Sequence, residues 1–173
     1  MMDLSAYIRD VPDFPRKGIL FKDITLLIAT PDAFSESVRQ MAGRAAKPDA
    51  VVAIESRGFI FGAPLAHAWH VPFVTARKFG KLPGKTVRQV YSLEYGEDTL
   101  ELHADSLQRG WSVVLVDDLL ATGGTAQATV GLVEQLGARV AVALFPVELR
   151  GLGGREKLAP TKVEALMTFD VAG

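Results

Sequence analysis

The stretch VVLVDDLLATGGTA, residues 113–126, decides the fold of this chain. Its first four residues are apolar and mostly β-branched, which predicts a strand buried on both faces, as in a parallel sheet. Asp117 and Asp118 follow directly, at the carboxyl end of that strand. Ligands of open α/β sheets bind at the carboxyl ends of the strands. The stretch therefore predicts an α/β fold that binds a polar ligand beside two carboxylates.

A loop of small residues follows the acids: Ala121, Thr122, Gly123, Gly124 and Thr125. Beyond it, apolar residues recur at helical spacing, beginning with Ala126, Val130 and Val133. The loop therefore lies at a helix N-terminus, where free backbone N–H groups and the helix dipole favour an anion. We expect it to bind a phosphate group.

Two acids beside a phosphate site are in conflict, because carboxylates repel phosphate. A ligand that also has sugar hydroxyls, or that brings a magnesium ion, removes the conflict. A ribose 5-phosphate group meets both demands. The alternative is a strand, turn and helix in which Asp117 and Asp118 only cap the helix, but a cap needs one acid and the sequence offers two.

The composition predicts one domain over residues 1–173, because 173 residues that are 49% hydrophobic can bury a full core. A net charge of −1 gives no basic surplus for nucleic acid or a membrane surface. Cysteine is absent, which excludes disulfides and thiol catalysis. No signal peptide and no apolar run of about 18 residues is present, so we expect a cytoplasmic protein without a membrane span.

The pattern of strand, polar turn and helix also occurs earlier in the chain. An apolar run over 50–54 predicts a buried strand, which ends in Glu55-Ser56-Arg57-Gly58 before a helix. Arg57 is then at the same sheet edge as Asp117 and can hold a second phosphate group. The alternative is a surface ion pair between Arg57 and Glu55.

A third strand over 71–76 leads into the cations Arg77, Lys78 and Lys81, a cluster that suits a polyanion. From Thr86 onward apolar residues alternate around a turn at 96–98, which predicts an antiparallel arm within 78–103. An arm flanked by glycines beside such a cluster suits a mobile lid. Glu94 lies near its tip and can be carried in and out of the site; the alternative is a plain surface carboxylate.

The N-terminal part carries weaker signals. Apolar residues at helical spacing over 4–11 predict a short helix that Pro12 ends. The next segment, 13–23, contains Phe14 and Phe21 between rigid turn residues. Phe21 is either part of the core or a flat face for a planar ligand.

Two more strands are expected over 140–145 and 163–169, with a loop and short turn over 146–158 between them. Within that loop, Gly151-Leu152-Gly153-Gly154 lacks the spacing of a dinucleotide fingerprint, and we assign it no function. The histidines show no metal-ligand spacing.

The stretch 113–126 resembles the phosphoribosyl pyrophosphate motif of type I phosphoribosyltransferases, in which apolar residues, two acids and a Thr-Gly-Gly-Thr-like loop occur in this order. From Asp13 to about Phe169 the chain resembles the adenine-using branch of that family. The segments that carry this resemblance are Asp13-Phe14-Pro15, Phe21-Lys22-Asp23, Glu55-Ser56-Arg57-Gly58-Phe59, Arg77-Lys78, Gly80-Lys81-Leu82-Pro83, Tyr91-Ser92-Leu93-Glu94-Tyr95-Gly96, Val147-Glu148-Leu149 and Gly154-Arg155. The chain departs from the pattern at Lys22, where many relatives have Arg.

The resemblance implies the type I phosphoribosyltransferase fold: a mostly parallel sheet flanked by helices, a flexible antiparallel lid arm over 78–103 and an N-terminal hood over 1–30 that recognises the base. It implies a homodimer that transfers ribose 5-phosphate from phosphoribosyl pyrophosphate to adenine and releases AMP and pyrophosphate. Magnesium is the implied cofactor, held mainly by phosphoribosyl pyrophosphate, with no direct protein ligand assigned.

The resemblance also implies roles for single residues. Glu94 and Arg57 are the implied catalytic residues, with Glu94 exchanging a proton with a purine ring nitrogen. The residues implied to bind the donor's ribose and 5-phosphate are Asp117, Asp118, Ala121, Thr122, Gly123, Gly124 and Thr125. The residues implied to bind pyrophosphate are Arg57, Arg77, Lys78 and Lys81. Those implied to bind adenine are Leu20, Phe21, Lys22 and Leu149. The alternatives are a phosphoribosyltransferase for a 6-oxopurine and a non-catalytic regulator that senses nucleotides.

Overall fold

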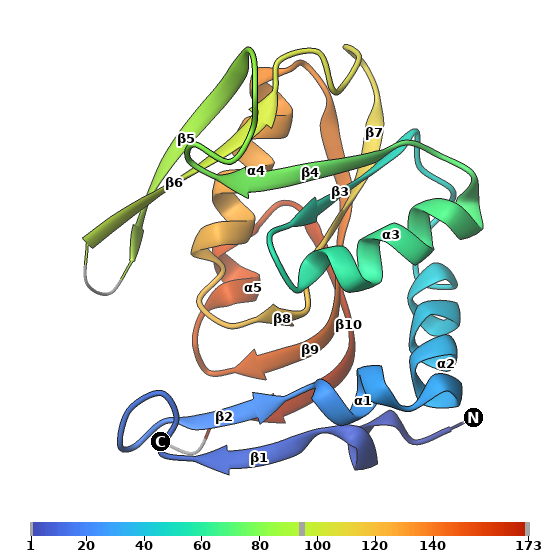
Figure 1. Ribbon diagram of the computed structural model, residues 1–173, viewed down its shortest axis with the longest axis vertical. Helices are drawn as coiled ribbons and strands as arrows, with labels where there is room; N and C mark the ends of the chain where they lie inside the picture. Colours follow the sequence, from blue (N-terminus) through green and yellow to red (C-terminus); the bar gives the residue numbers. More distant parts are fainter. Residues whose placement is uncertain (1, 94–95, 172–173) are drawn as a thin grey trace.

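The computed structural model describes residues 2–93 and 96–171, in which helices cover both faces of a large sheet (Figure 1). The strands of this sheet are β3 (Ala50–Ile54), β4 (Phe73–Lys78), β5 (Thr86–Leu93), β6 (Gly96–His103), β7 (Ser112–Val116), β8 (Leu119–Leu120), β9 (Arg139–Arg150) and β10 (Lys162–Asp170). The helices are η1 (Leu4–Tyr7), α1 (Thr25–Ala29), α2 (Pro31–Ala42), α3 (Gly58–Trp69), α4 (Gly124–Gln135) and α5 (Gly154–Lys157). A separate two-stranded sheet consists of β1 (Arg9–Pro12) and β2 (Leu20–Asp23).

The large sheet has the strand order β10-β9-β7-β3-β4-β6-β5, with β8 beside β9. Neighbouring strands from β10 to β4 are parallel, and β6 pairs antiparallel with both β4 and β5. The predicted strand over 113–116 is β7, which lies next to the fully buried β3 at the centre of the sheet. The mostly parallel α/β fold expected from the sequence is confirmed.

Helices cover both faces because the central strands are apolar on both sides. On one face Val52 packs in a buried cluster with Leu132 of α4. On the other face the neighbouring residue Val51 packs in a cluster with Phe61 of α3. Packing on both faces holds β3 and β7 in place, and so it positions the sheet edge at which both strands end. Within the described residues, no helix is both long enough and apolar enough to cross a membrane.

The hairpin of β5 and β6 forms the antiparallel arm that the alternating pattern predicts. It extends from the edge of the sheet (green in Figure 1), and its β5 strand lies along α4. The side-chain amide of Gln135 on α4 donates a hydrogen bond of 2.9 Å to Oε1 of Gln89 on β5. Glu94, the predicted catalytic residue at the tip, lies outside the described residues.

Two local predictions from the sequence are wrong. The expected helix over 4–11 is only one 3-10 turn, η1, after which the chain forms β1 and pairs with β2. The expected loop from Pro146 begins only after Arg150, because β9 continues between β8 and β10. Pro146 has no register partner in either neighbouring strand, so its missing N–H interrupts no ladder contact there.

The close packing of α3 on β3 gives a first prediction. A Cβ added at Gly62 would lie 2.5 Å from Cβ of Ala53 and 3.1 Å from the ring of Phe73, so Gly62→Ala forces the helix away from the strand. We expect the free energy of unfolding to fall by about 1–3 kcal/mol, as is usual for an overpacked core. Urea unfolding measures the change. Gly43→Ala is the control, because its nearest atoms lie at 3.5 and 3.7 Å; equal stability of both variants would contradict the prediction.

Candidate active site

The polar residues that follow β3 and β7 meet at one edge of the sheet, because these parallel neighbours end side by side. A cavity of about 340 Å³ lies at this edge. Its lining residues are Ile54, Glu55, Ser56, Arg57, Lys78, Tyr91, Asp98, Leu100, Asp117, Asp118 and Thr125. It therefore contains both acids of the stretch 113–126, part of its loop, and residues of the arm.

The two acids lie in a poorly solvated position. Asp118 is buried, and its backbone N–H donates a hydrogen bond of 2.9 Å to Oδ1 of Asp117. Burial and the charge of Asp118 raise the pKa of Asp117 well above its ordinary value. Burial also raises the pKa of Asp118, although the charge of Arg57 opposes that rise. The pair is therefore costly to ionise unless a ligand supplies hydrogen-bond donors or positive charge.

Arg57 links the acids to the N-terminal sheet. Its Nε lies 3.0 Å from Oδ2 of Asp118, an ion-pair distance. The geometry is not that of a hydrogen bond, so within the described part of the chain this buried oxygen has no hydrogen-bond donor. The guanidinium carbon also lies 5.5 Å from the ring centroid of Phe21. The alternative ion pair between Arg57 and Glu55 is not what the structure has, because Glu55 binds Arg77 instead.

The predicted anion loop, residues 121–125 and hereafter the phosphate loop, turns directly into α4. Gly123 has a φ of 76°, a left-handed conformation that favours glycine, and α4 begins at Gly124 without a side-chain cap. The first N–H groups of a helix have no partner within it. Thr125 lines the cavity beside the acids, so the loop and the acid pair open on the same space.

The predicted cations divide into two groups. Arg57 and Lys78 line the cavity, and Nζ of Lys78 lies 3.1 Å from Oδ2 of Asp98. Arg77 instead donates to both carboxylate oxygens of Glu55, at 2.9 and 3.3 Å, which lowers the pKa of Glu55. Arg77 also donates to the carbonyl oxygen of Lys81, at 3.2 Å. Neither Arg77 nor Lys81 lines the cavity.

Tyr91 and Asp98 also line the cavity, although the sequence did not predict them as site residues. The Tyr91 hydroxyl donates a hydrogen bond of 3.3 Å to Oδ2 of Asp98, and burial raises the pKa of Tyr91. A Cβ added at Gly124 would lie 3.7 Å from the carbonyl oxygen of Ser92 and 3.9 Å from Cδ2 of Tyr91, ordinary van der Waals distances. The alternation along the arm was the available signal, since it gives Val87 and Tyr91 the same parity, and both pack against the core. The arm thus lies beside the start of α4 and lines the same cavity as Thr125.

The four predicted adenine residues come from two elements. The ring of Phe21 on β2 packs edge to face against the ring of Phe14, with centroids 5.1 Å apart. The same ring also contacts the guanidinium of Arg57. The side chain of Lys22 is instead directed to Asp10, at 2.5 Å, and to the ring of Phe169, at 4.3 Å. Leu20 is exposed, and Leu149 is half-buried on β9, where it is the register partner of Phe169. The contact with Arg57 places Phe21 beside a residue that lines the cavity.

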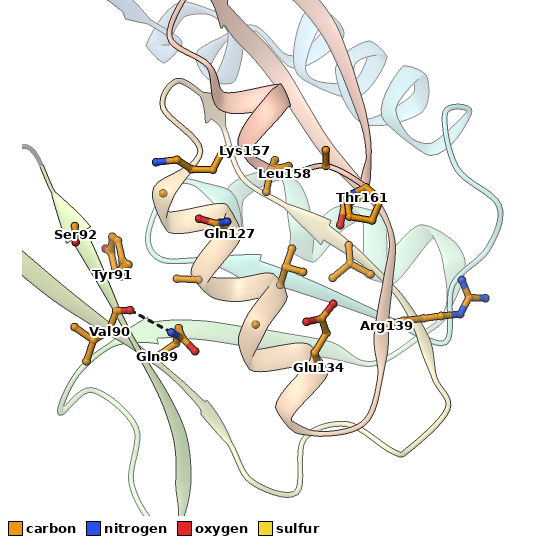
Figure 2. A pocket seen from close by; sticks show the side chains of 17 residues that line it. Gln89, Val90, Tyr91, Ser92, Gln127, Glu134, Arg139, Lys157, Leu158 and Thr161 are labelled. Atoms are coloured by element: carbon orange, nitrogen blue, oxygen red, sulfur yellow. Dashed lines mark hydrogen bonds between the residues drawn. The ribbon is translucent and has the colours of Figure 1, made fainter.

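A larger cavity, of about 760 Å³, lies between the arm and the other side of α4. Figure 2 shows it bounded by Gln89, Val90 and Tyr91 of the arm, by Gln127 and Glu134 of α4, and by the segment after α5. It contains neither acid of the pair and not Arg57. The smaller cavity is the candidate active site, because chemistry depends on convergent polar groups rather than on size.

A strand, two acids and an anion loop at the carboxyl edge of a parallel sheet, under an antiparallel arm, define a type I phosphoribosyltransferase. The family model described as "Phosphoribosyl transferase domain" matches residues 25–160. The chain is 52% identical to an adenine phosphoribosyltransferase of Carboxydothermus hydrogenoformans, over 97% of this chain and all of the relative. The chain belongs to the adenine phosphoribosyltransferase family.

Solved structures agree with this placement. The crystal structure of an adenine phosphoribosyltransferase from Thermoanaerobacter pseudethanolicus is 48% identical and has a TM-score of 0.93, covering 96% of this chain and 98% of that one. The Saccharomyces cerevisiae enzyme is 40% identical with a TM-score of 0.89, over 95% and 96% of the two chains. That enzyme was crystallised with adenine and an iminoalditol bisphosphate.

The raised pKa of Asp117 gives a prediction about pH. Between its ordinary value of 3.8 and its raised value, folded parent protein keeps a proton that the unfolded chain loses, so parent stability falls as the pH rises through that window. Asp117→Asn lacks this loss. We expect the variant to be more stable at neutral pH, by roughly 0.5–2 kcal/mol, with no advantage below pH 3.8.

Urea unfolding at a series of pH values measures this difference. The control is Asp105→Asn, because Asp105 is exposed and lies outside the cavity. A stability difference between Asp117→Asn and parent that stays constant with pH would contradict the prediction. The parent's loss of stability would then not come from ionisation of the Asp117 carboxyl group.

Proposed function

We propose that the protein transfers ribose 5-phosphate from phosphoribosyl pyrophosphate to adenine and so forms AMP and pyrophosphate, the purine-salvage reaction of its family. The observation that carries the proposal is the meeting of the acid pair and the phosphate loop in one cavity. Membership in the family supports the choice of adenine, since the relatives named above are adenine phosphoribosyltransferases.

The donor is held at its sugar and its 5-phosphate. Asp117 and Asp118 accept hydrogen bonds from the ribose hydroxyls, which satisfies the buried Oδ2 of Asp118 that has no donor in the described structure. The 5-phosphate binds the backbone N–H groups and threonine hydroxyls of the phosphate loop, Ala121, Thr122, Gly123, Gly124 and Thr125. The sugar is thus fixed at both ends while its anomeric carbon reacts.

The leaving pyrophosphate is stabilised by cations. The transition state is oxocarbenium-like, so charge builds up on the departing oxygen and must be neutralised. Arg57 and Lys78 are in place at the cavity, while Arg77 and Lys81 stand at the base of the arm. Lys78 and Arg77 exchange their present partners, Asp98 and Glu55, for pyrophosphate oxygens when the donor binds.

Adenine binds between the N-terminal sheet and β9. Phe21 stacks on the base, Leu149 contacts it, and the backbone of Leu20 to Lys22 recognises its amidine edge. The side chain of Lys22 takes no direct part, because Asp10 and Phe169 hold it. It anchors the strand that carries Phe21 instead.

Magnesium is the cofactor that fits this site. Among the described residues no group of three or more potential ligands is gathered, so the protein alone offers no cage for the ion. A metal held mainly by the oxygens of phosphoribosyl pyrophosphate requires no such cage. When bound, it supplies further neutralisation of the pyrophosphate charge.

The bond between the anomeric carbon and pyrophosphate breaks, and a bond from that carbon to a ring nitrogen of adenine forms. Arg57 is catalytic through the charge it places beside Asp118 and the leaving group. Glu94 takes the proton that the purine ring loses. Closure of the arm excludes water, which would otherwise hydrolyse the donor. A homodimer and a cytoplasmic location remain predictions from the resemblance and the sequence.

The choice of base gives a direct prediction. With magnesium and phosphoribosyl pyrophosphate, the protein should form AMP from adenine much faster than it forms nucleotide from hypoxanthine, guanine or orotate. Product analysis by chromatography measures this. Absence of AMP would overturn the proposed function, and faster use of hypoxanthine or guanine would favour the 6-oxopurine alternative.

Two variants separate proton transfer from donor binding. Glu94→Gln should lower kcat about 10²-fold, the usual contribution of a general acid or base, with little change in either KM. Asp118→Asn should mainly raise the KM for phosphoribosyl pyrophosphate, because it removes an acceptor for a ribose hydroxyl. Glu97→Gln, exposed on the same arm, is the control. Parent-like kcat in Glu94→Gln would remove its proton-transfer role.

A further inference from the structure

The segment Gly153-Gly154, which the proposed reaction does not use, lies directly behind the phosphate loop. A Cβ added at Gly154 would overlap the carbonyl oxygen of Ala121 and would lie 2.9 Å from Cδ1 of Leu120. One added at Gly123 would lie 2.8 Å from the carbonyl oxygen of Gly154. The backbone of α5 therefore touches the backbone of the phosphate loop, with no side chain between them.

Arg155 fixes α5 in this position. Its guanidinium donates two hydrogen bonds to Glu148, of 2.9 and 2.5 Å, and a third, of 2.8 Å, to the carbonyl oxygen of Val163. The hydrogen bond to Glu148 raises the pKa of Arg155, which keeps the fork charged. These contacts tie α5 to both β9 and β10. Arg155 does not line the candidate active site.

Glu148 connects the same ion pair to the loop from the other side. Its carboxylate is buried, with the side chain 7% exposed, and binds Arg155. Its backbone is the register partner of Leu120 on β8, the residue directly before the phosphate loop. One residue of β9 thus holds the start of the loop through its backbone and holds α5 against that loop through its side chain.

The phosphate loop needs such support because it has little of its own. Its residues are small, and α4 begins without a side-chain cap. Backbone N–H groups bind an anion well only when they converge on it, and displacement of a binding group by about 1 Å can cost up to ~10²-fold in rate. A rigid neighbour in direct backbone contact supplies the missing constraint.

We propose that Gly154, Arg155 and Glu148 are positioning residues that brace the phosphate loop in the conformation that binds the 5-phosphate of phosphoribosyl pyrophosphate. The inference rests on the proposed function, since it takes the loop to be the 5-phosphate site. It gives a role to the glycine-rich segment that fits no dinucleotide motif. None of the three residues lines the candidate active site.

The main test is Gly154→Ala, studied in the full chain. The added methyl group pushes the phosphate loop out of position, so the Kd for phosphoribosyl pyrophosphate with magnesium, measured by calorimetry, should rise at least about tenfold. The KM for adenine should change less than about twofold, because Phe21 and Leu149 lie on other elements. Gly43→Ala, which meets no close neighbour, should bind the donor like parent.

A second pair of variants guards against failure of Gly154→Ala to fold. Arg155→Met leaves the buried carboxylate of Glu148 without its cation, and Arg155→Lys keeps the charge but loses the two-pronged geometry. Donor Kd should rise in the order parent, Arg155→Lys, Arg155→Met, and by a larger factor than adenine KM, because Leu149, next to Glu148 on β9, is only one part of the proposed adenine site. Arg139→Met is the control, since Arg139 is exposed on the same strand as Glu148.

The outcomes are distinct. Parent-like donor affinity in folded Gly154→Ala, or in Arg155→Met, would overturn the brace and leave the proposed function intact. Equal losses of affinity for donor and adenine would also overturn it, because they indicate general destabilisation. Failure of the parent protein to bind phosphoribosyl pyrophosphate would overturn the proposed function as well.

Discussion

The placement of two adjacent carboxylates, Asp117 half-buried and Asp118 buried, at the end of a central strand is the constraint on which the rest of this structure depends. The charged form of each acid is disfavoured there, because burial raises the pKa of both. The charge of Arg57 offsets only part of that rise. Folded domains are only marginally stable, so such a site persists only where the surrounding core is strong. The two apolar clusters on either side of β3 and β7 provide that core.

The site divides its tasks among elements of different origin. The acids and the phosphate loop belong to the sheet and α4, within the region 25–160 that matches the phosphoribosyl transferase domain. Phe21 and Lys22 lie before that region, on the small separate sheet. In the proposed reaction the matched region binds the donor, and the base contacts both the small sheet and Leu149 of β9. The arm, inserted between β4 and β7, lines the candidate active site through Tyr91, Asp98 and Leu100.

Features that follow from local pattern were predictable from sequence. In residues 113–126 the periodicity and the composition agree. The run from Val113 to Val116 predicts a buried strand, the two acids predict the ligand-binding edge of the sheet, and the phosphate loop predicts the start of a helix. The pairing of side chains was not predictable: Glu55 has two candidate arginines within reach, and only the sheet geometry places it with Arg77. The partners of the Lys22 side chain were not predictable for the same reason, because strand direction alone does not reveal Asp10 and Phe169 as its neighbours. The short N-terminal pattern over 4–11 fitted a helix, but pairing with β2 outweighed it.

The small sheet of β1 and β2 has a consequence for dynamics. A two-stranded sheet is at best marginally stable alone, and in the described part of the chain this one shares no strand ladder with the large sheet. Its order depends on a few attachments, among them Lys22 to Phe169 and Phe21 beside Arg57. Segments with few contacts to the core open locally at a lower cost in free energy than global unfolding. In terms of the proposed function, opening of the small sheet exposes Phe21, the proposed stacking face for adenine, while the large sheet, the acids and the phosphate loop stay folded.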